Sequence, residues 1–195
     1  IMDKPLKLSE VKPAVELLRK NNLFVHGFFI FGLPGERDED RQATVDLIKN
    51  VGIDWSNITA AAPLMGSRLY DICKEKGYIR DNKDLLNSHI FQATIRTPDI
   101  DPDALSEYIY IVNLDVNFVN NRRMKTEEYE IARGYFNNVV SHHPSHAFAH
   151  YYLAMAYKGM GAKQELIDYH MNIFQEIINT DSAWDKYAKH FDLVL

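Results

Sequence analysis

The chain has 195 residues, of which 46% are hydrophobic, enough to bury one large or two small cores. Its formal net charge of −5 argues against a nucleic-acid surface. The short basic cluster of Arg122, Arg123 and Lys125 is explained by a solvated helix end. No apolar run approaches the ~20 residues of a membrane span, and one cysteine, Cys73, is typical of a reducing compartment. We therefore expect a cytoplasmic protein with neither nucleic acid nor membrane as a partner.

A helix is predicted over Ser9–Asn21, followed by an apolar strand that ends at a glycine-proline bend. The stretch Phe24–Phe31 is apolar at both strand parities, which is typical of parallel strands between helix layers. Gly32 carries no side chain that would keep a ligand from the backbone, and Pro34-Gly35 turns the chain toward the next helix. Ligands of such sheets bind where the strands end, so this bend predicts a binding edge.

Two phosphate-binding glycine motifs do not fit this bend. Gly27 and Gly32 have the spacing of a P-loop, but Leu33-Pro34 stands where that motif needs Lys and Ser or Thr. The dinucleotide fingerprint Gly-x-Gly-x-x-Gly also fails, because Gly35 comes three residues after Gly32 without a glycine two residues before Gly32. Nucleotide binding by either route is therefore not expected.

Phe29–Glu36 resembles the end of the fifth strand of the radical S-adenosylmethionine (radical SAM) barrel. On the same resemblance, Asp38–Val51 is the following helix, Ile58–Ala62 the sixth strand and Pro63–Tyr70 the loop into the last barrel helix. The resemblance is to the cobalamin-binding branch with its anaerobic cyclase-like Fe-S oxidoreductases. It implies an α/β fold for residues 1–97: the C-terminal portion of a partial (β/α)6 barrel, with two parallel strands and their helices.

The same resemblance implies a set of residues that bind S-adenosylmethionine, with Ile30 and Gly32 against its adenine end, and no catalytic residue or metal ligand. This set consists of Phe28, Ile30, Gly32, Ala61, Ala62 and Pro63. Phe28 stands where the family has a glycine, and Glu36 comes one residue later than the family's acid, so no role is carried over to Glu36. Phe28 and Ile30 also fit the role of plain core residues of the barrel. His26 lies on the same face of the strand and fits the role of a hydrogen-bonded core histidine. Gly66-Ser67 fits a turn followed by a helix N-cap.

Radical SAM enzymes hold a [4Fe-4S] cluster with three cysteines, and this chain has one. Cys73 lies in an apolar helical stretch, where a buried unreactive thiol is expected. We therefore expect the chain to be part of a larger protein that supplies the cluster and, on this resemblance, cobalamin. Alone it should be inactive, and its open sheet edge and uncovered apolar face favour a homo-oligomer.

The second half changes to helical patterns. Asp81–Gln92 is irregular, Thr97–Pro102 reads as a linker, and Asp103–Asn121 predicts a helix, giving a linker and connecting helix over 98–125. From Thr126 onward a 34-residue period resembles the tetratricopeptide repeat (TPR). We expect a TPR-like antiparallel helical array over 126–195, with helices at Ala147–Met160 and Lys163–Asn179.

Histidines lie close together near the start of the first of these helices. His146 and His150 are four residues apart, a spacing that can bind zinc, but no acidic residue or cysteine accompanies them at ligand spacing. A native metal site is not expected there.

Two hypotheses for the function follow. In the first, the chain completes the S-adenosylmethionine-bearing barrel of a radical SAM oxidoreductase or methyltransferase acting on an unknown small molecule. In the second, it is a non-catalytic interaction module whose TPR-like helices bind a protein partner.

Overall fold

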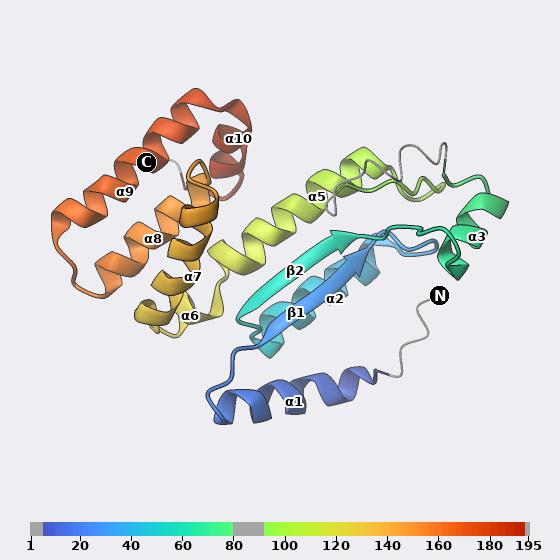
Figure 1. Cartoon of the computed structure of the whole chain (residues 1–195), viewed down its shortest axis with the longest axis horizontal. Coiled ribbons are helices and arrows are strands. Elements are labelled where there is room, and N and C mark those ends of the chain that lie inside the picture. Colours follow the sequence, from blue (N-terminus) through green and yellow to red (C-terminus); the bar gives the residue numbers. More distant parts are fainter. Residues whose placement is uncertain (1–5, 80–91, 194–195) are drawn as a thin grey trace. The chain divides into compact units, whose positions relative to one another are not determined.

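The computed structural model describes residues 6–79 and 92–193, which belong to two compact units, residues 1–116 and 117–195 (Figure 1). The first, the α/β unit, contains α1 (Leu8–Lys20), β1 (His26–Phe31), α2 (Asp38–Val51), β2 (Trp55–Ala60), α3 (Arg68–Glu75) and α5 (Pro102–Leu114). A π-helical turn, Asp115–Val119, follows α5. The second, the helical unit, contains α6 (Arg122–Lys125), α7 (Tyr129–His142), α8 (Ala147–Gly159), α9 (Gln164–Thr180) and α10 (Ser182–His190). Within the described residues, every helix is too short or too polar to cross a membrane.

The two strands are parallel neighbours, as expected, in a sheet of two strands among the described residues. Their register runs from the pair His26–Trp55 to the pair Phe31–Ala60. The connecting helix α2 has the predicted bounds and ends at Gly52, which adopts a left-handed φ of 72°. The expected strand Ile58–Ala62 is wrong at both ends. It begins three residues earlier, because Trp55, Ser56 and Asn57 also pair with β1, and it ends at Ala60.

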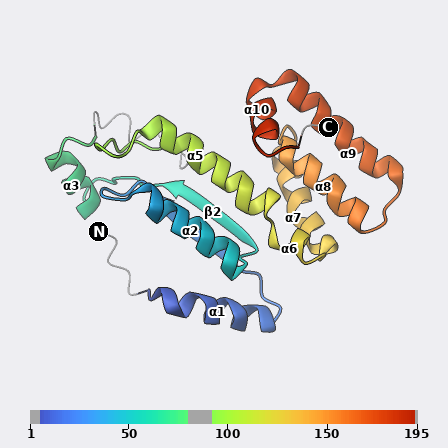
Figure 2. The same cartoon turned by 180° about the vertical axis from the view of Figure 1, so that it is seen from behind.

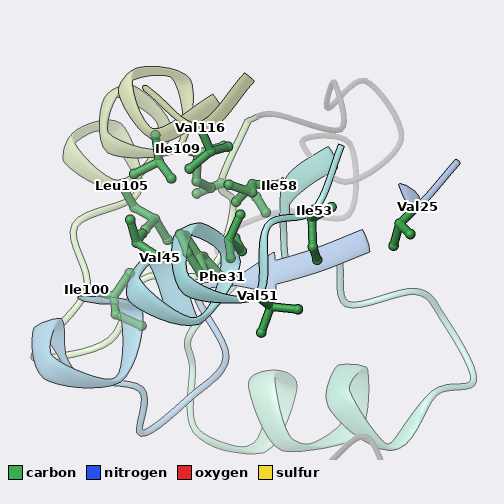
Figure 3. Close-up of a cluster of buried hydrophobic side chains, with 14 of the residues drawn as sticks. Val25, Phe31, Val45, Val51, Ile53, Ile58, Ile100, Leu105, Ile109 and Val116 are labelled. Atoms are coloured by element: carbon green, nitrogen blue, oxygen red, sulfur yellow. The ribbon is translucent and has the colours of Figure 1, made fainter. Parts of the chain in front are cut away.

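One face of this sheet carries the core of the α/β unit. Phe31 and Ile58 are fully buried beneath apolar residues of α2 and α5, such as Val45 and Ile109 (Figure 3). Figure 2 shows α2 and α5 beside the two strands. The opposite parity is open: the side chain of Phe28 is 74% exposed. The apolar residues of β1 are therefore covered on one face within the described residues.

The segment expected to be a linker is part of this core. Thr97 and Ile100 form an isolated antiparallel bridge, and Ile100 is buried. Asp101 then caps α5 by accepting hydrogen bonds from the N–H groups of Asp103 and Ala104, each at 3.0 Å. α5 packs on β2, and the chain divides into its two units after Val116. The boundaries expected at residues 97 and 125 stay predictions. The irregular stretch expected at 81–92 lies outside the described residues except for its last residue.

The helical unit is built around α8, which packs on both α7 and α9. The predicted helices are confirmed to within one residue at each end. Most of α8 is buried, because its small and aromatic residues meet neighbours on several sides. Phe118 packs against Phe136 at 5.6 Å between ring centroids and against Tyr152 at 6.2 Å. Aromatic side chains of the same chain thus fill this face of α8.

Candidate functional site

A small pocket lies at the carboxyl ends of the two parallel strands. Its volume is about 210 Å³, and its lining includes Ile30, Leu33, Ala61, Ala62, Ser67 and Arg68. Three of these, Ile30, Ala61 and Ala62, belong to the cofactor-binding set predicted from the sequence. The wall is mostly apolar, and the two alanines leave space for a flat group to approach the backbone. The position agrees with the rule that ligands of parallel sheets bind beyond the carboxyl ends of the strands.

The other three predicted residues do not line this pocket. Phe28 lies two residues before Ile30 on the same face of β1, where it stacks on His26 with ring centroids 4.5 Å apart. His26 itself is exposed, so it is not a core histidine within the described residues. Pro63 is fully buried beside the lining residue Ala62.

Gly32 is buried at the end of β1, and its backbone conformation and surroundings both favour glycine. Its φ is +89°, and a Cβ atom there would lie 2.6 Å from Cδ2 of Leu105 in α5. An L-residue is strained at this φ, and Leu105 already occupies the adjacent space. A side chain at Gly32 would therefore collide with α5, and the expected approach of a ligand to Gly32 stays a prediction.

Glu36 has a structural role that the sequence did not indicate. Its carboxylate accepts a hydrogen bond from the Gly32 N–H at 2.6 Å and another from Arg41 Nη1 at 3.2 Å. Arg41 is 7% exposed and also pairs with Asp38 at the start of α2. One buried guanidinium thus ties the bend after β1 to the first turn of α2, and a charge-assisted network of this kind holds a loop in one conformation.

On the other side of the pocket, Ser67 caps α3. Its hydroxyl oxygen accepts a hydrogen bond from the Tyr70 N–H at 3.2 Å, which confirms the turn and N-cap expected at Gly66-Ser67. Cys73 lies further along α3, fully buried against Ala61 and Ile95. Burial raises the pKa of the Cys73 thiol, as expected for an unreactive structural cysteine.

A larger cavity of about 820 Å³ lies between α2 and α5, with Asp38, Asp46, Asp101 and Tyr108 in its lining. Arg41 also lies in its lining, where it pairs with Glu36 and Asp38. We place the candidate site in the smaller pocket, because the smaller pocket is built from the strand ends.

The histidines of the helical unit do not gather around one point. His146 caps α8, with Nδ1 accepting a hydrogen bond from the Ala149 N–H at 3.1 Å. His150 Nε2 lies 2.9 Å from the Pro144 carbonyl, and His150 Nδ1 lies 3.0 Å from Nδ1 of His170. A carbonyl only accepts, so Nε2 of His150 donates and its Nδ1 accepts from His170. Among the described residues, no group of three potential ligands could hold a metal ion.

Burial lowers the pKa values of these imidazoles. The pKa of His146 and that of His170 each fall from 6.5 to about 4, chiefly because burial disfavours the charged ring. The pKa of His150 is lowered for the same reason. All three rings are therefore neutral at pH 7, and their hydrogen bonds serve the packing of the helices.

No protein-family model matches the chain, but parts of three known proteins are similar to it. A cytidylyl-2-hydroxyethylphosphonate methyltransferase of Streptomyces wedmorensis is 30% identical over 63% of this chain and 24% of its own length. An uncharacterised methyltransferase of Pyrococcus horikoshii is 38% identical over 30% of this chain and 13% of its own length. A tRNA-2-methylthio-N(6)-dimethylallyladenosine synthase of Zymomonas mobilis is 39% identical over 34% of this chain and 13% of its own length.

The chain thus spans a quarter or less of the length of each of these relatives. The similarities support the resemblance to the radical SAM superfamily and, within it, to methyltransferases and a synthase that modifies tRNA. The TPR-like resemblance of the helical unit stays a prediction.

Proposed function

We propose that this chain works as part of a longer radical SAM methyltransferase, in which its α/β unit contributes the last two strands of a partial barrel. The observation that carries the proposal is the pocket at the carboxyl ends of β1 and β2, which has Ile30, Ala61 and Ala62 in its wall. Two of the three relatives are methyltransferases, which favours methyl transfer over the oxidoreductase alternative.

The described residues fit one part of the cofactor. The apolar wall and the two alanines suit the flat face of an adenine ring, which gains from burial and close backbone approach. The iron-sulfur cluster does not fit this chain, since its single cysteine cannot supply three thiolate ligands. Such a cluster would supply the electron for the reductive cleavage of S-adenosylmethionine. We therefore propose that another part of the protein holds the cluster, and that this chain contributes to binding the adenosyl group.

The open face and edge of β1 support the barrel arrangement. Its side chains His26, Phe28 and Ile30 are exposed, and β1 has a described strand on one side only. A further parallel strand on the other side would pair the backbone N–H and C=O groups of that edge. It would also begin to cover the face of β1 that carries these three side chains. The resemblance to the cobalamin-binding branch adds cobalamin as the expected methyl carrier. The absorbance of bound cobalamin in the purified full-length protein would test this role of cobalamin separately from the rest of the proposal.

Calorimetric titration of the full-length protein with S-adenosylmethionine tests the site. Ala62→Phe fills the pocket from an exposed position on its wall, so affinity should fall at least about tenfold. Ala14→Phe is the matched control, because Ala14 is an exposed alanine of α1 in the same unit. If the unaltered protein fails to bind S-adenosylmethionine, the proposed function is wrong. If it binds and Ala62→Phe binds equally well, the cofactor lies elsewhere.

A further inference from the structure

At Ile58, the outer edge of β2 is bonded by one side chain of α5. Asn113 Oδ1 accepts a hydrogen bond from the Ile58 backbone N–H at 3.2 Å, and Asn113 Nδ2 donates to the Ile58 carbonyl at 2.9 Å. The same Nδ2 donates to the Ile109 carbonyl, one turn earlier in α5, at 2.9 Å. The three bonds agree on one orientation of the amide, because a carbonyl only accepts and an N–H only donates.

These bonds lie on the side of β2 that faces away from β1. Trp55 and Ala61 donate their N–H groups to the carbonyls of Val25 and Phe31, at 3.3 and 2.7 Å. Successive residues of a strand point their N–H and C=O groups to opposite edges, so odd-numbered residues of β2 pair with β1. Ile58 belongs to the even set on the other edge. One amide thus supplies it with the acceptor and the donor that a further parallel strand would provide.

We propose that Asn113 is a positioning residue that takes the place of a neighbouring strand, ends the sheet at β2 and holds the carboxyl end of that strand at the pocket. Ile58 lies three residues before the lining residue Ala61, and Ile58 and Ile109 are both fully buried in the shared core (Figure 3). An unpaired strand edge can slip or pair with another chain. With this edge occupied, the two-stranded sheet of the described residues can be extended at β1.

Residue-resolved hydrogen exchange of this chain, followed by NMR, tests the edge. In Asn113→Leu, the Ile58 amide should exchange about tenfold faster than in the unaltered chain, because it loses its acceptor. The Thr59 amide is the internal control, since its N–H belongs to the set that faces β1. Asn50→Leu is the matched substitution, because Asn50 is exposed in α2.

Equal acceleration at Ile58 and Thr59, or none at Ile58, would overturn the proposal. If Asn113→Leu does not fold, Asn113→Gln replaces it. Glutamine keeps the amide but displaces it by one methylene, so Ile58 should again exchange faster relative to Thr59, and an unchanged ratio contradicts the proposal.

The link to the pocket rests on the proposed function and has its own measurement. In the full-length protein, Asn113→Leu should weaken S-adenosylmethionine binding about three- to tenfold, as the rim of the pocket loses its support. Failure of the unaltered protein to bind S-adenosylmethionine would refute the proposed function and leave the exchange result standing. Unchanged affinity in Asn113→Leu, together with faster exchange at Ile58, would refute the positioning of the pocket.

Discussion

The bend after β1 contains two glycines with nearly the same φ angle and different surroundings. Gly32 has a φ of +89° and Gly35 a φ of +90°. Alanine at either position should cost about 1–2 kcal/mol of unfolding free energy, because its Cβ crowds the backbone in this region. A Cβ at Gly35 would have no atom within 4 Å, whereas one at Gly32 would lie 2.6 Å from Leu105 Cδ2.

This difference sets the expected magnitudes. Leu105 is 5% exposed and belongs to the core cluster, so its side chain can yield only by disturbing its neighbours. Overpacking of this kind costs about a further 1–3 kcal/mol. We therefore expect Gly35→Ala to lose about 1–2 kcal/mol and Gly32→Ala about 2–5 kcal/mol.

Urea unfolding followed by tryptophan fluorescence measures both losses. The chain has two tryptophans, Trp55 in the α/β unit and Trp184 in the helical unit, so a Trp184→Phe background restricts the signal to the α/β unit. The change in unfolding free energy caused by Leu105→Ala should be non-additive with the change caused by Gly32→Ala and additive with the change caused by Gly35→Ala. Equal losses for the two glycine variants, or no coupling between Gly32 and Leu105, would refute the reasoning.

Two further predictions concern charge. Glu36→Gln should lower the unfolding free energy by about 1–3 kcal/mol, because its buried charge-assisted hydrogen bonds weaken, whereas Glu39→Gln, at a side chain 77% exposed, should change it by less than about 0.5 kcal/mol. Equal effects in urea unfolding would contradict the role of Glu36. The pKa values of about 4 for His146 and His170 lie below the unfolded value of 6.5. Between about pH 4 and pH 6.5 the folded state therefore binds fewer protons than the unfolded state. The stability conferred by the neutral rings is complete above about pH 6.5 and falls as pH drops toward 4, by up to about 3 kcal/mol for each ring. Unfolding followed at Trp184 should show this decline, and a flat profile from pH 7 to 4 would contradict it.

Local sequence determined several elements of this protein. The acidic residues at the start of α2 and the glycine after its end are signals within the helix and its flanks, and the predicted bounds Asp38–Val51 match the structure. The bounds of α8 and α9 were predicted from the 34-residue period of the sequence and match the structure to within one residue at each end. Ser67 could be recognised as an N-cap from its immediate neighbours.

Part of the candidate site could also be predicted. The radical SAM resemblance placed Ile30, Ala61 and Ala62 at one site, and all three line the pocket. Their role in binding a cofactor stays a prediction. The reason for Gly32 could not be predicted, because the atom that excludes a side chain there belongs to Leu105 in a helix 73 positions later in the chain.

Tertiary structure decided the contacts whose partners are far apart in the sequence. β2 begins at Trp55 because β1 pairs with Trp55, Ser56 and Asn57 as well, and the Asn113 amide bonds Ile58 across 55 residues. His150 meets His170 across 20 residues rather than joining His146 at helical spacing. Capping, turn and periodicity signals act over one or two helical turns, whereas a polar side chain takes whichever partner the folded chain brings within hydrogen-bond distance.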